Sequence, residues 1–341
     1  MIRAVPTLEQ RLDAALGAAW RNLPRVVRAP GRVNLIGDHT DYNDGFVLPA
    51  AIQLECVVAA SPADNNRLRT LDDVDPGWTR YVDAVASELG GALEGTVASS
   101  VPPGAGLASS AALEVACAVA IAPEQPSREL ALACRRAEHA ATGVPSGVMD
   151  QLASICGCAG RALLIDCRSL EITPVALPED LALVVVHSGV HRRLEGSAYG
   201  DRRAECEADA HALGLTSLRD ATPTDVRGRP RARHVVTENA RVLAAVDALA
   251  DGDLERLGAL FDESHASLRD DFEVSTPELD VLADELVRGG ALGARLTGAG
   301  FGGCVVAVAT RDRIDDVLAA AGDRYAFVAE ASEGAGEWSP T

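Results

Sequence analysis

The sequence predicts an α+β fold. Strand-like runs occur in the first half of the chain, at residues 26–29 and 46–60, whereas long segments of helical periodicity dominate the second half. Near the end, four glycines within residues 298–303 precede another strand-like run at 304–309. Strands and helices that are segregated along a chain in this way are typical of α+β proteins.

The chain of 341 residues is long enough for two domains. The change from strand-rich to helix-rich sequence predicts a boundary near Pro178. This boundary gives an N-terminal domain of residues 1–178 and a C-terminal domain of residues 179–341.

The elements of the first half follow from periodicity and from the residues that interrupt it. Residues 7–20 form an amphipathic helical pattern, and Asn43-Asp44-Gly45 is a turn signal between the first two strand-like runs. A helical segment at 78–89 ends at Gly90-Gly91, and small apolar residues recur at helical spacing over 109–121. The remaining predictions for this half are a helix from Ser127, as N-cap, to about residue 141, and strands at 162–166 and 181–187.

The second half is mainly helical. The sequence predicts helices at 198–212, 233–249, 254–268 and 277–288, then the strand 304–309, a helix at 312–321 and a strand at 325–329. The polar residues after Gly334 predict a frayed tail.

The charge pattern excludes several functions. The formal net charge is −19, which argues against nucleic acid as a partner because a phosphate backbone binds basic faces. The sequence contains no lysine, which excludes a P-loop lysine, a protein-kinase strand lysine and a pyridoxal Schiff-base lysine. A site for nucleotide phosphates must therefore use backbone N–H groups, arginine and metal.

Hydropathy and cysteine spacing predict a cytoplasmic protein. No run approaches the roughly 18 apolar residues of a membrane span, and the first six residues contain no signal-peptide core. The eight cysteines form no Cys-x-x-Cys pair, which favours reduced, structural thiols.

The segment 29–43 concentrates polar groups in an apolar setting. Arg32, Asp38, His39 and Asp41 lie within ten residues of one another, with Leu35-Ile36 between them. Partly buried polar side chains at this density need hydrogen-bond partners. A polyhydroxylated ligand would supply such partners, and a satisfied polar turn is the structural alternative.

Two glycine-rich segments are candidates for close approach to a phosphate. In residues 102–111, Gly104 and Gly106 precede a helix that starts at Ser109-Ser110, so that backbone N–H groups and the positive end of the helix dipole can face an anion. The serine hydroxyls could cap this helix, and one could coordinate Mg²⁺. The second segment is 298–303. A capped helix start and a tight hairpin are the structural alternatives.

A fourth patch lies at residues 137–151. Asp150 follows a glycine-containing turn and opens an apolar run, which is the environment of a general base or of a carboxylate paired with arginine. Glu138, near the end of a helix, is a candidate Mg²⁺ ligand, and a solvated helix residue is the alternative.

Together these segments resemble the galactokinases of the GHMP small-molecule kinase family. Residues 31–42, Gly-Arg-Val-Asn-Leu-Ile-Gly-Asp-His-Thr-Asp-Tyr, are similar to the galactokinase signature. Residues 103–110 are similar to the phosphate-binding motif of the family, and 295–303 to its third motif. The resemblance spans nearly the whole chain. It implies an N-terminal domain like part of a ribosomal protein and a ferredoxin-like C-terminal domain.

The resemblance also implies a reaction and a set of site residues. The reaction is transfer of the γ-phosphoryl group of MgATP to the C1 hydroxyl of galactose by a monomer, with ATP and Mg²⁺ bound and no membrane partner. Asp150 would be the catalytic base, and Arg32 would keep it ionised and stabilise charge on the phosphoryl group. Ser109 and Glu138 would hold Mg²⁺. The residues implied to bind the sugar are Asp38, His39, Thr40, Asp41, Gly147 and Tyr199. The residues implied to bind ATP are Trp78, Pro103, Gly104, Ala105, Gly106, Leu107, Ala108, Ser109 and Ser110.

Two departures from the family pattern leave alternatives open. Asp38 stands where many relatives have glutamate, and the region 187–199 lacks an asparagine that is often found there. One alternative is a kinase for another sugar, such as N-acetylgalactosamine or arabinose. The other is a non-catalytic sensor of galactose and ATP, against which the presence of Ser109, Glu138 and Asp150 argues.

Overall fold

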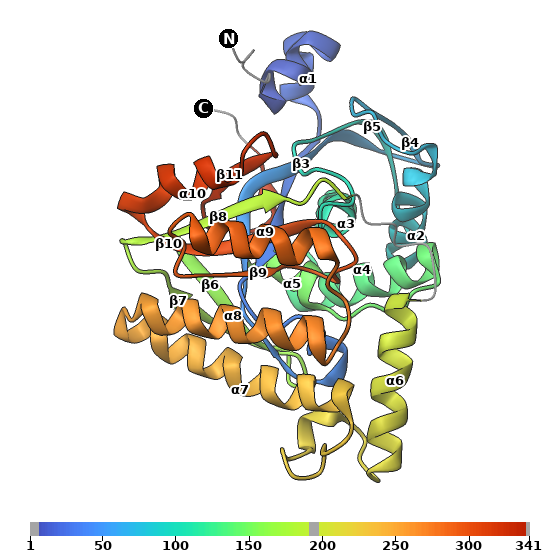
Figure 1. Cartoon of the computed structure of the whole chain (residues 1–341). Helices are drawn as coiled ribbons and strands as arrows, with labels where there is room; N and C mark the ends of the chain where they lie inside the picture. Colours follow the sequence, from blue (N-terminus) through green and yellow to red (C-terminus); the bar gives the residue numbers. More distant parts are fainter. Residues whose placement is uncertain (1–6, 191–197, 339–341) are drawn as a thin grey trace.

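Three β-sheets organise the molecule in the computed structural model, which describes residues 7–190 and 198–338 (Figure 1). The strand orders are β12-β1-β3-β5-β4, β11-β8-β10-β9 and β2-β6-β7. Neighbouring strands are antiparallel except β4 and β5, which are parallel and are connected through α2.

The strands are β1 (Arg25–Asn34), β2 (Phe46–Val47), β3 (Pro49–Ala63), β4 (Arg67–Thr70), β5 (Ala92–Ser99), β6 (Arg161–Asp166), β7 (Glu171–Ala176), β8 (Leu181–His187), β9 (Gly293–Leu296), β10 (Cys304–Thr310), β11 (Ala326–Ala329) and β12 (Gly336–Glu337). The α-helices are α1 (Leu8–Leu16), α2 (Thr79–Leu89), α3 (Ser109–Ile121), α4 (Ser127–Thr142), α5 (Met149–Cys156), α6 (Ala198–Ala212), α7 (Pro230–Asp251), α8 (Leu254–Asp270), α9 (Pro277–Arg288) and α10 (Ile314–Ala320). This mixture of separate sheets and helices confirms the predicted fold class.

The pair β1–β3 forms the frame of the first sheet. Its register runs from Arg25 opposite Ala60 to Asn34 opposite Pro49, and it shifts between Pro30 and Arg32. Gly31 lies at this irregularity, and a Cβ there would be 2.7 Å from the carbonyl oxygen of Leu107. A bulge of this kind re-aims the following side chain and lets another backbone approach closely. The end of β1 is therefore placed directly against the glycine-containing loop before α3.

Helix α3 is buried on nearly every face, and its alanine, valine and cysteine side chains leave no polar side that could face solvent. It packs against β1 and β3 on one side and against α2, α4 and α5 on the others. A helix that is apolar on every face is stable only inside the core. This packing brings the N-termini of α3 and α5 close to the end of β1.

The second half supplies a helical layer. Helices α8 and α9 pack on β9 and β10, and α7 packs on α8 (Figure 1). The largest buried cluster crosses the predicted boundary, because Val242, Leu257 and Val306 belong to the same core as Val33 and Leu163. The division at residue 178 stays a prediction.

Several local predictions were wrong. The residues after Gly334 were predicted to fray, but 335–338 do not: β12 pairs with β1, Trp338 donates its backbone N–H to Val26 O at 2.8 Å, and its ring stacks on Trp20. Residues 339–341 lie outside the described residues. Ser127 is the first helical residue and not the N-cap, which is Pro126. Neither Ser109 nor Ser110 caps α3, since the N-cap is Ala108 in a left-handed conformation. Helix α5 and the strands β4, β5, β7, β9 and β12 were not predicted from the sequence.

All eight cysteines are free thiols. None of the helices between residues 7 and 338 that the structure describes is both long and apolar enough to cross a membrane.

Candidate active site

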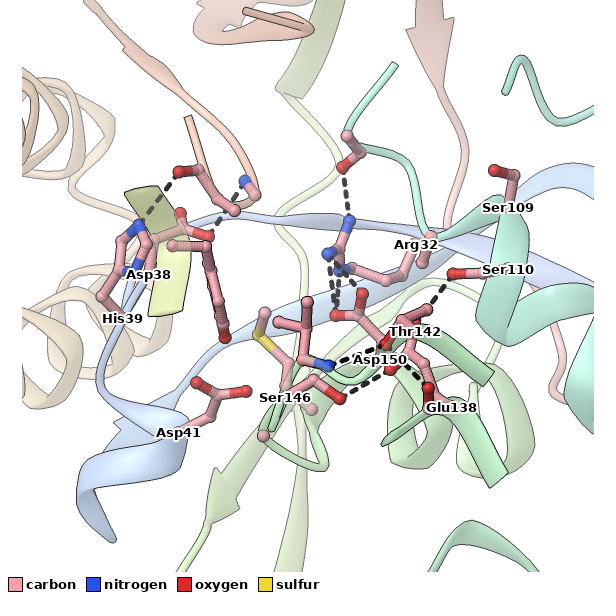
Figure 2. Close-up of a pocket in the computed structure, with 18 of the residues that line it drawn as sticks. Arg32, Asp38, His39, Asp41, Ser109, Ser110, Glu138, Thr142, Ser146 and Asp150 are labelled. Carbon is pink, nitrogen blue, oxygen red and sulfur yellow. Dashed lines mark hydrogen bonds and ion pairs between the residues drawn. The ribbon is translucent and has the colours of Figure 1, made fainter. Parts of the chain in front are cut away.

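A pocket lies between the end of β1, the loop before α3 and the turn after β9 (Figure 2). At one end lie Asp38, His39 and Asp41, and at the other lie Ser109, Ser110 and Glu138. Arg32 and Asp150 lie between the two ends. The residues that line the pocket are Arg32, Asp38, His39, Asp41, Gly104, Gly106, Ala108, Ser109, Ser110, Glu138, Thr142, Val144, Ser146, Gly147, Met149, Asp150, Tyr199, Gly298 and Ala299.

An arginine–carboxylate pair occupies the centre of the pocket. Arg32 Nε and Nη2 each donate a 2.8 Å hydrogen bond to a different oxygen of Asp150. The guanidinium is almost completely buried, whereas 29% of the Asp150 side chain is exposed. Arg32 Nη1 also donates to Gly106 O at 2.5 Å. This bidentate geometry fixes the orientation of both groups and leaves part of the carboxylate open to a ligand.

The loop before α3 presents unused backbone donors. Between residues 104 and 109 of the described chain, no backbone N–H donates a hydrogen bond within the protein. Gly104 and Gly106 both have positive φ angles, and a Cβ on Gly106 would lie 2.9 Å from Thr297 O. Unpaired N–H groups at the start of a helix form a site for anions.

Glu138 is surrounded by hydrogen-bond donors. Ser110 Oγ donates to Glu138 Oε1 at 3.0 Å, and Ser146 Oγ donates to Oε2 at 2.6 Å. Gln151 Nε2 also donates to Oε2, at 3.1 Å. Ser109 makes no such bond and points away from Glu138 (Figure 2). Of the two serines, the structure therefore brings Ser110 to the carboxylate.

The described residues contain no cluster of three or more carboxylate, histidine or cysteine ligands. One carboxylate beside a hydroxyl and an anion-binding loop nevertheless suits Mg²⁺, which commonly takes one or two carboxylates and completes its shell with phosphate oxygens and water.

Asp38 is held inside a buried charge network. Arg295 Nη2, on β9, donates to Asp38 Oδ2 at 2.6 Å, and the backbone N–H of Gly298 donates to Oδ1 at 2.9 Å. Helix α7 holds the backbone of the same loop, since Glu238 Oε1 accepts from Gly37 N at 2.9 Å and His234 Nε2 lies 3.1 Å from Asp38 O. Burial lowers the pKa of His234 to about 4, which keeps its ring neutral and able to donate from one nitrogen.

His39 belongs to an aromatic group at the same end. Its φ angle is 67°, a left-handed conformation that is unusual for a residue other than glycine. Its Nδ1 lies 2.8 Å from the Tyr42 hydroxyl, and its Nε2 lies 3.2 Å from Ala299 O. The His39 ring also packs against Tyr199 and Phe272. The local backbone strain is thus compensated by contacts with α6 and with the second half of the chain.

Asp41 faces Gly147. A Cβ at position 147 would lie only 1.7 Å from Asp41 Oδ2, so any larger residue there would displace the Asp41 carboxylate. Burial, together with the nearby negative charge of Asp150, raises the pKa of Asp41 to about 7. Asp41 can therefore change its charge near neutral pH.

The comparisons with known proteins agree with this geometry. A family model described as the galactokinase galactose-binding signature matches residues 17–62, and the GHMP kinase N-terminal and C-terminal models match residues 79–158 and 245–326. The galactokinase of Lactococcus lactis, solved in complex with galactose, is 30% identical and has a TM-score of 0.85. The match covers 96% of this chain and 98% of that chain.

The chain belongs to the galactokinase family. It is a GHMP kinase, a transferase that uses ATP to phosphorylate a sugar hydroxyl. The resemblance predicted from the sequence is confirmed.

More distant relatives share the fold. The L. major mevalonate kinase, solved with R-mevalonate, is 21% identical with a TM-score of 0.68, over 90% of this chain and 95% of that chain. The homoserine kinase of Cytophaga hutchinsonii is 18% identical with a TM-score of 0.60, over 92% of this chain and 96% of that chain. At these identities the likeness extends to the fold alone.

Five residues predicted to bind ligands do not line the pocket of this galactokinase-family chain. Thr40 is fully buried, and its hydroxyl lies 2.7 Å from Gly37 O and 2.6 Å from Phe46 O, inside the turn. Ala105 and Leu107 are likewise buried. Trp78 and Pro103 lie outside the pocket lining, because Trp78 packs at the start of α2 against the core and Pro103 is exposed on the loop. The remaining predicted residues all line the pocket.

Two partners of Glu138 were not predicted from the sequence. Ser146 and Gln151 bond to Glu138, yet neither was among the predicted site residues. Both lie in the patch 137–151 that the sequence singled out, and their proximity to Asp150 was the available signal.

Proposed function

We propose that this chain transfers the γ-phosphoryl group of ATP to the C1 hydroxyl of galactose. The observation that carries the proposal is the position of the Arg32–Asp150 pair between an anion-binding loop and an end rich in carboxylates. A sugar at the carboxylate end and a nucleotide at the loop would meet at this pair.

Asp150 acts as the base in this proposal. Its exposed part faces the pocket, while Arg32 fixes its orientation and stabilises the anion. Asp150 accepts the hydroxyl proton as the new bond between the sugar oxygen and phosphorus forms and the bond to ADP breaks. Arg32 also places positive charge next to the transferring group, where negative charge is spread over the phosphoryl oxygens.

The loop before α3 binds the phosphates of ATP through the N–H groups of residues 104–109. Glu138 and Ser110 would hold Mg²⁺, because they provide adjacent oxygen ligands beside that loop. When bound, Mg²⁺ neutralises charge on the β- and γ-phosphate oxygens.

The sugar hydroxyls are bound by the other end of the pocket. The Asp41 carboxylate supplies acceptors, Asp38 forms part of the pocket wall, and Tyr199 with His39 supplies an aromatic wall. Hydroxyl donors of a sugar match such a set of carboxylate acceptors. This assignment also uses the galactose that is bound in the structure of the Lactococcus lactis relative.

The proposal is tested by incubating the purified chain with ATP, Mg²⁺ and galactose and by identifying the product by NMR spectroscopy. Formation of galactose 1-phosphate and ADP is expected. A panel of sugars that includes N-acetylgalactosamine and arabinose, ranked by kcat/KM, tests the substrate. Higher kcat/KM for another sugar would assign that sugar as the substrate, and binding of galactose and ATP without turnover would favour the sensor.

A further inference from the structure

A second buried polar group lies behind the phosphate end of the pocket. Gln151 follows Asp150 on α5, and its side chain is completely buried. Its Nε2 donates to Glu138 Oε2 at 3.1 Å and to Glu114 Oε2, on α3, at 3.2 Å. One amide group thus bridges two carboxyl groups from two other helices. Glu114 itself is fully buried and does not line the pocket.

Two oxygen atoms in this bridge have no partner. Gln151 Oε1 and Glu114 Oε1 are both buried without a hydrogen bond. A buried polar atom left in this way costs about 1–3 kcal/mol, so such atoms are uncommon in a core and call for a physical explanation. A protonated Glu114 carboxyl group would carry a hydrogen-bond donor on one of its oxygens. Burial of Glu114, with the nearby charge of Glu138 acting in the same direction, raises the pKa of its carboxyl group well above the usual range.

We propose that Glu114 and Gln151 are positioning residues that hold Glu138 at the phosphate end of the pocket. Gln151 fixes one oxygen of Glu138, and Glu114 fixes the amide of Gln151 from behind. The inference rests on the proposed function in one respect, because it takes Glu138 as a ligand of Mg²⁺.

The positions of these residues on their helices explain how the Glu114–Gln151–Glu138 bridge affects catalysis. Ser110 and Glu114 lie one turn apart on α3, and residues four apart project from the same face of a helix. Asp150 and Gln151 are consecutive on α5, and Glu138 lies on α4. The bridge therefore joins the three helices that carry the proposed base and both proposed metal ligands. Partners of metal ligands commonly set the orientation of those ligands.

The experiment compares four variants: Glu114→Gln, Glu114→Leu, Gln151→Met and, as a control, Glu124→Leu. Glutamine at position 114 keeps an acceptor oxygen and places an NH2 donor group where the acid has its hydroxyl, whereas leucine removes both donor and acceptor. Glu124 is exposed on the turn after α3, where replacement leaves the bridge intact. The Mg²⁺ concentration for half-maximal rate is measured with galactose. Calorimetry measures the affinity for galactose, and separately the affinity for Mg²⁺ with a non-hydrolysable ATP analogue.

Glu114→Leu and Gln151→Met are expected to raise the Mg²⁺ requirement about 10- to 100-fold, the usual cost of removing a partner of a metal ligand. Galactose affinity should stay unchanged, because neither residue contacts the sugar end. Glu114→Gln should retain the wild-type Mg²⁺ requirement, as should Glu124→Leu. The inference is overturned if Glu114→Gln is as impaired as Glu114→Leu, or if no variant changes the Mg²⁺ affinity.

A measurement on the wild-type chain guards against variants that fail to fold. Both side-chain amide protons of Gln151 bond to carboxyl groups, so their exchange with solvent, followed by NMR, should be slow. Rapid exchange would refute the bridge whatever the variants do. A wild-type chain that shows slow exchange but no activity with galactose would contradict the proposed function and leave the bridge standing.

Discussion

The two ends of the pocket are built in different ways. The side chains of the phosphate end come from one stretch of chain, residues 104–146, whose loop and helices pack on one another. The sugar end combines residues 38–41 with Tyr199 and with the turn after β9, more than 250 residues further along the chain. A phosphate end whose side chains come from one stretch and a sugar end that also uses Tyr199 and the turn after β9 would allow the sugar to change while phosphate binding is retained.

The two ends also use buried arginine differently. Arg32 and Asp150 form a pair in which the carboxylate is 29% exposed, whereas the Arg295–Asp38 pair is closed to solvent on both sides, at 0% and 2%. A carboxylate must reach the substrate to take part in proton transfer, so only Asp150 is suited to that role. Arg295 and Asp38 instead give the sugar end its shape.

The largest effect should come from Asp150→Asn. Asparagine is close in size but cannot act as a base, so we expect kcat to fall by about 10²- to 10⁴-fold, the range of general-base catalysis. The affinity for galactose should change little. Steady-state kinetics and calorimetry measure these quantities, and circular dichroism controls for folding. Near-normal kcat would show that the proton leaves by another route.

Asp38→Asn should act on stability instead. It leaves Arg295 buried with a weaker partner, and breaking a buried ion pair costs about 3–5 kcal/mol. Glu238 Oε1, 3.8 Å from Arg295, offsets part of this cost, so we expect about 3 kcal/mol in the free energy of unfolding from urea titration. Glu94→Gln, in an exposed pair with Arg67, is the matched control and should cost under about 1 kcal/mol. Equal effects of the two substitutions would contradict the contrast drawn between buried and exposed pairs.

The difference between local signals and long-range contacts explains which features could be predicted from the sequence. The elements 109–121 and 277–288 were predicted with correct bounds, because periodicity and flanking residues are local signals. The pairing of Arg32 with Asp150 entered through similarity to the family, and periodicity alone would not have given it. Arg295 contacts Asp38 across 257 positions, a contact that tertiary packing determines. Strand β12 was missed for the same reason, since its short polar sequence forms a strand only against β1.

Replacement of Ser110 and of Ser109 tests which hydroxyl serves the phosphate end. Ser110→Ala removes the hydroxyl that bonds to Glu138, so the Mg²⁺ concentration for half-maximal rate should rise about 10-fold or more. Ser109→Ala should have a smaller effect, although Ser109 was the residue predicted to bind the metal. The two variants are matched in chemistry and adjacent in sequence. A larger effect for Ser109→Ala would restore the original assignment.

The pH dependence of sugar binding tests Asp41. Because the pKa of Asp41 is about 7 in the empty pocket, about a tenth of the molecules carry the carboxylate at pH 6 and about nine-tenths at pH 8. A sugar hydroxyl donates to the ionised form, so galactose affinity should rise about 10-fold across this range, with release of a proton. Asp41→Asn should flatten this profile. Calorimetry in buffers of different ionisation enthalpy measures both quantities, and an affinity that falls with pH would contradict the role of Asp41.

The raised pKa of Asp41 also predicts a pH dependence of stability, and its sign is opposite to that of the galactose affinity. The folded state keeps a proton on this group that the unfolded state loses near the usual pKa of aspartate. Between about pH 4 and pH 7 the folded state therefore binds more protons, and the contribution of Asp41 to stability falls as pH rises. The difference in unfolding free energy between the wild type and Asp41→Asn, measured at pH 5 and pH 7, isolates this contribution.

The smallest effect on sugar binding should come from Thr40→Val, beside Asp41. The Thr40 hydroxyl lies against two backbone carbonyl groups of its own turn and outside the pocket lining. Valine keeps the shape but removes the donor, which should lower the unfolding free energy by about 1–3 kcal/mol while the KM for galactose stays unchanged. A raised KM at unchanged stability would place Thr40 in the sugar site, as the family resemblance implied. Thr40→Val and Asp41→Asn change adjacent residues. Together they distinguish Thr40, which supports the sugar end, from Asp41, which contacts the sugar.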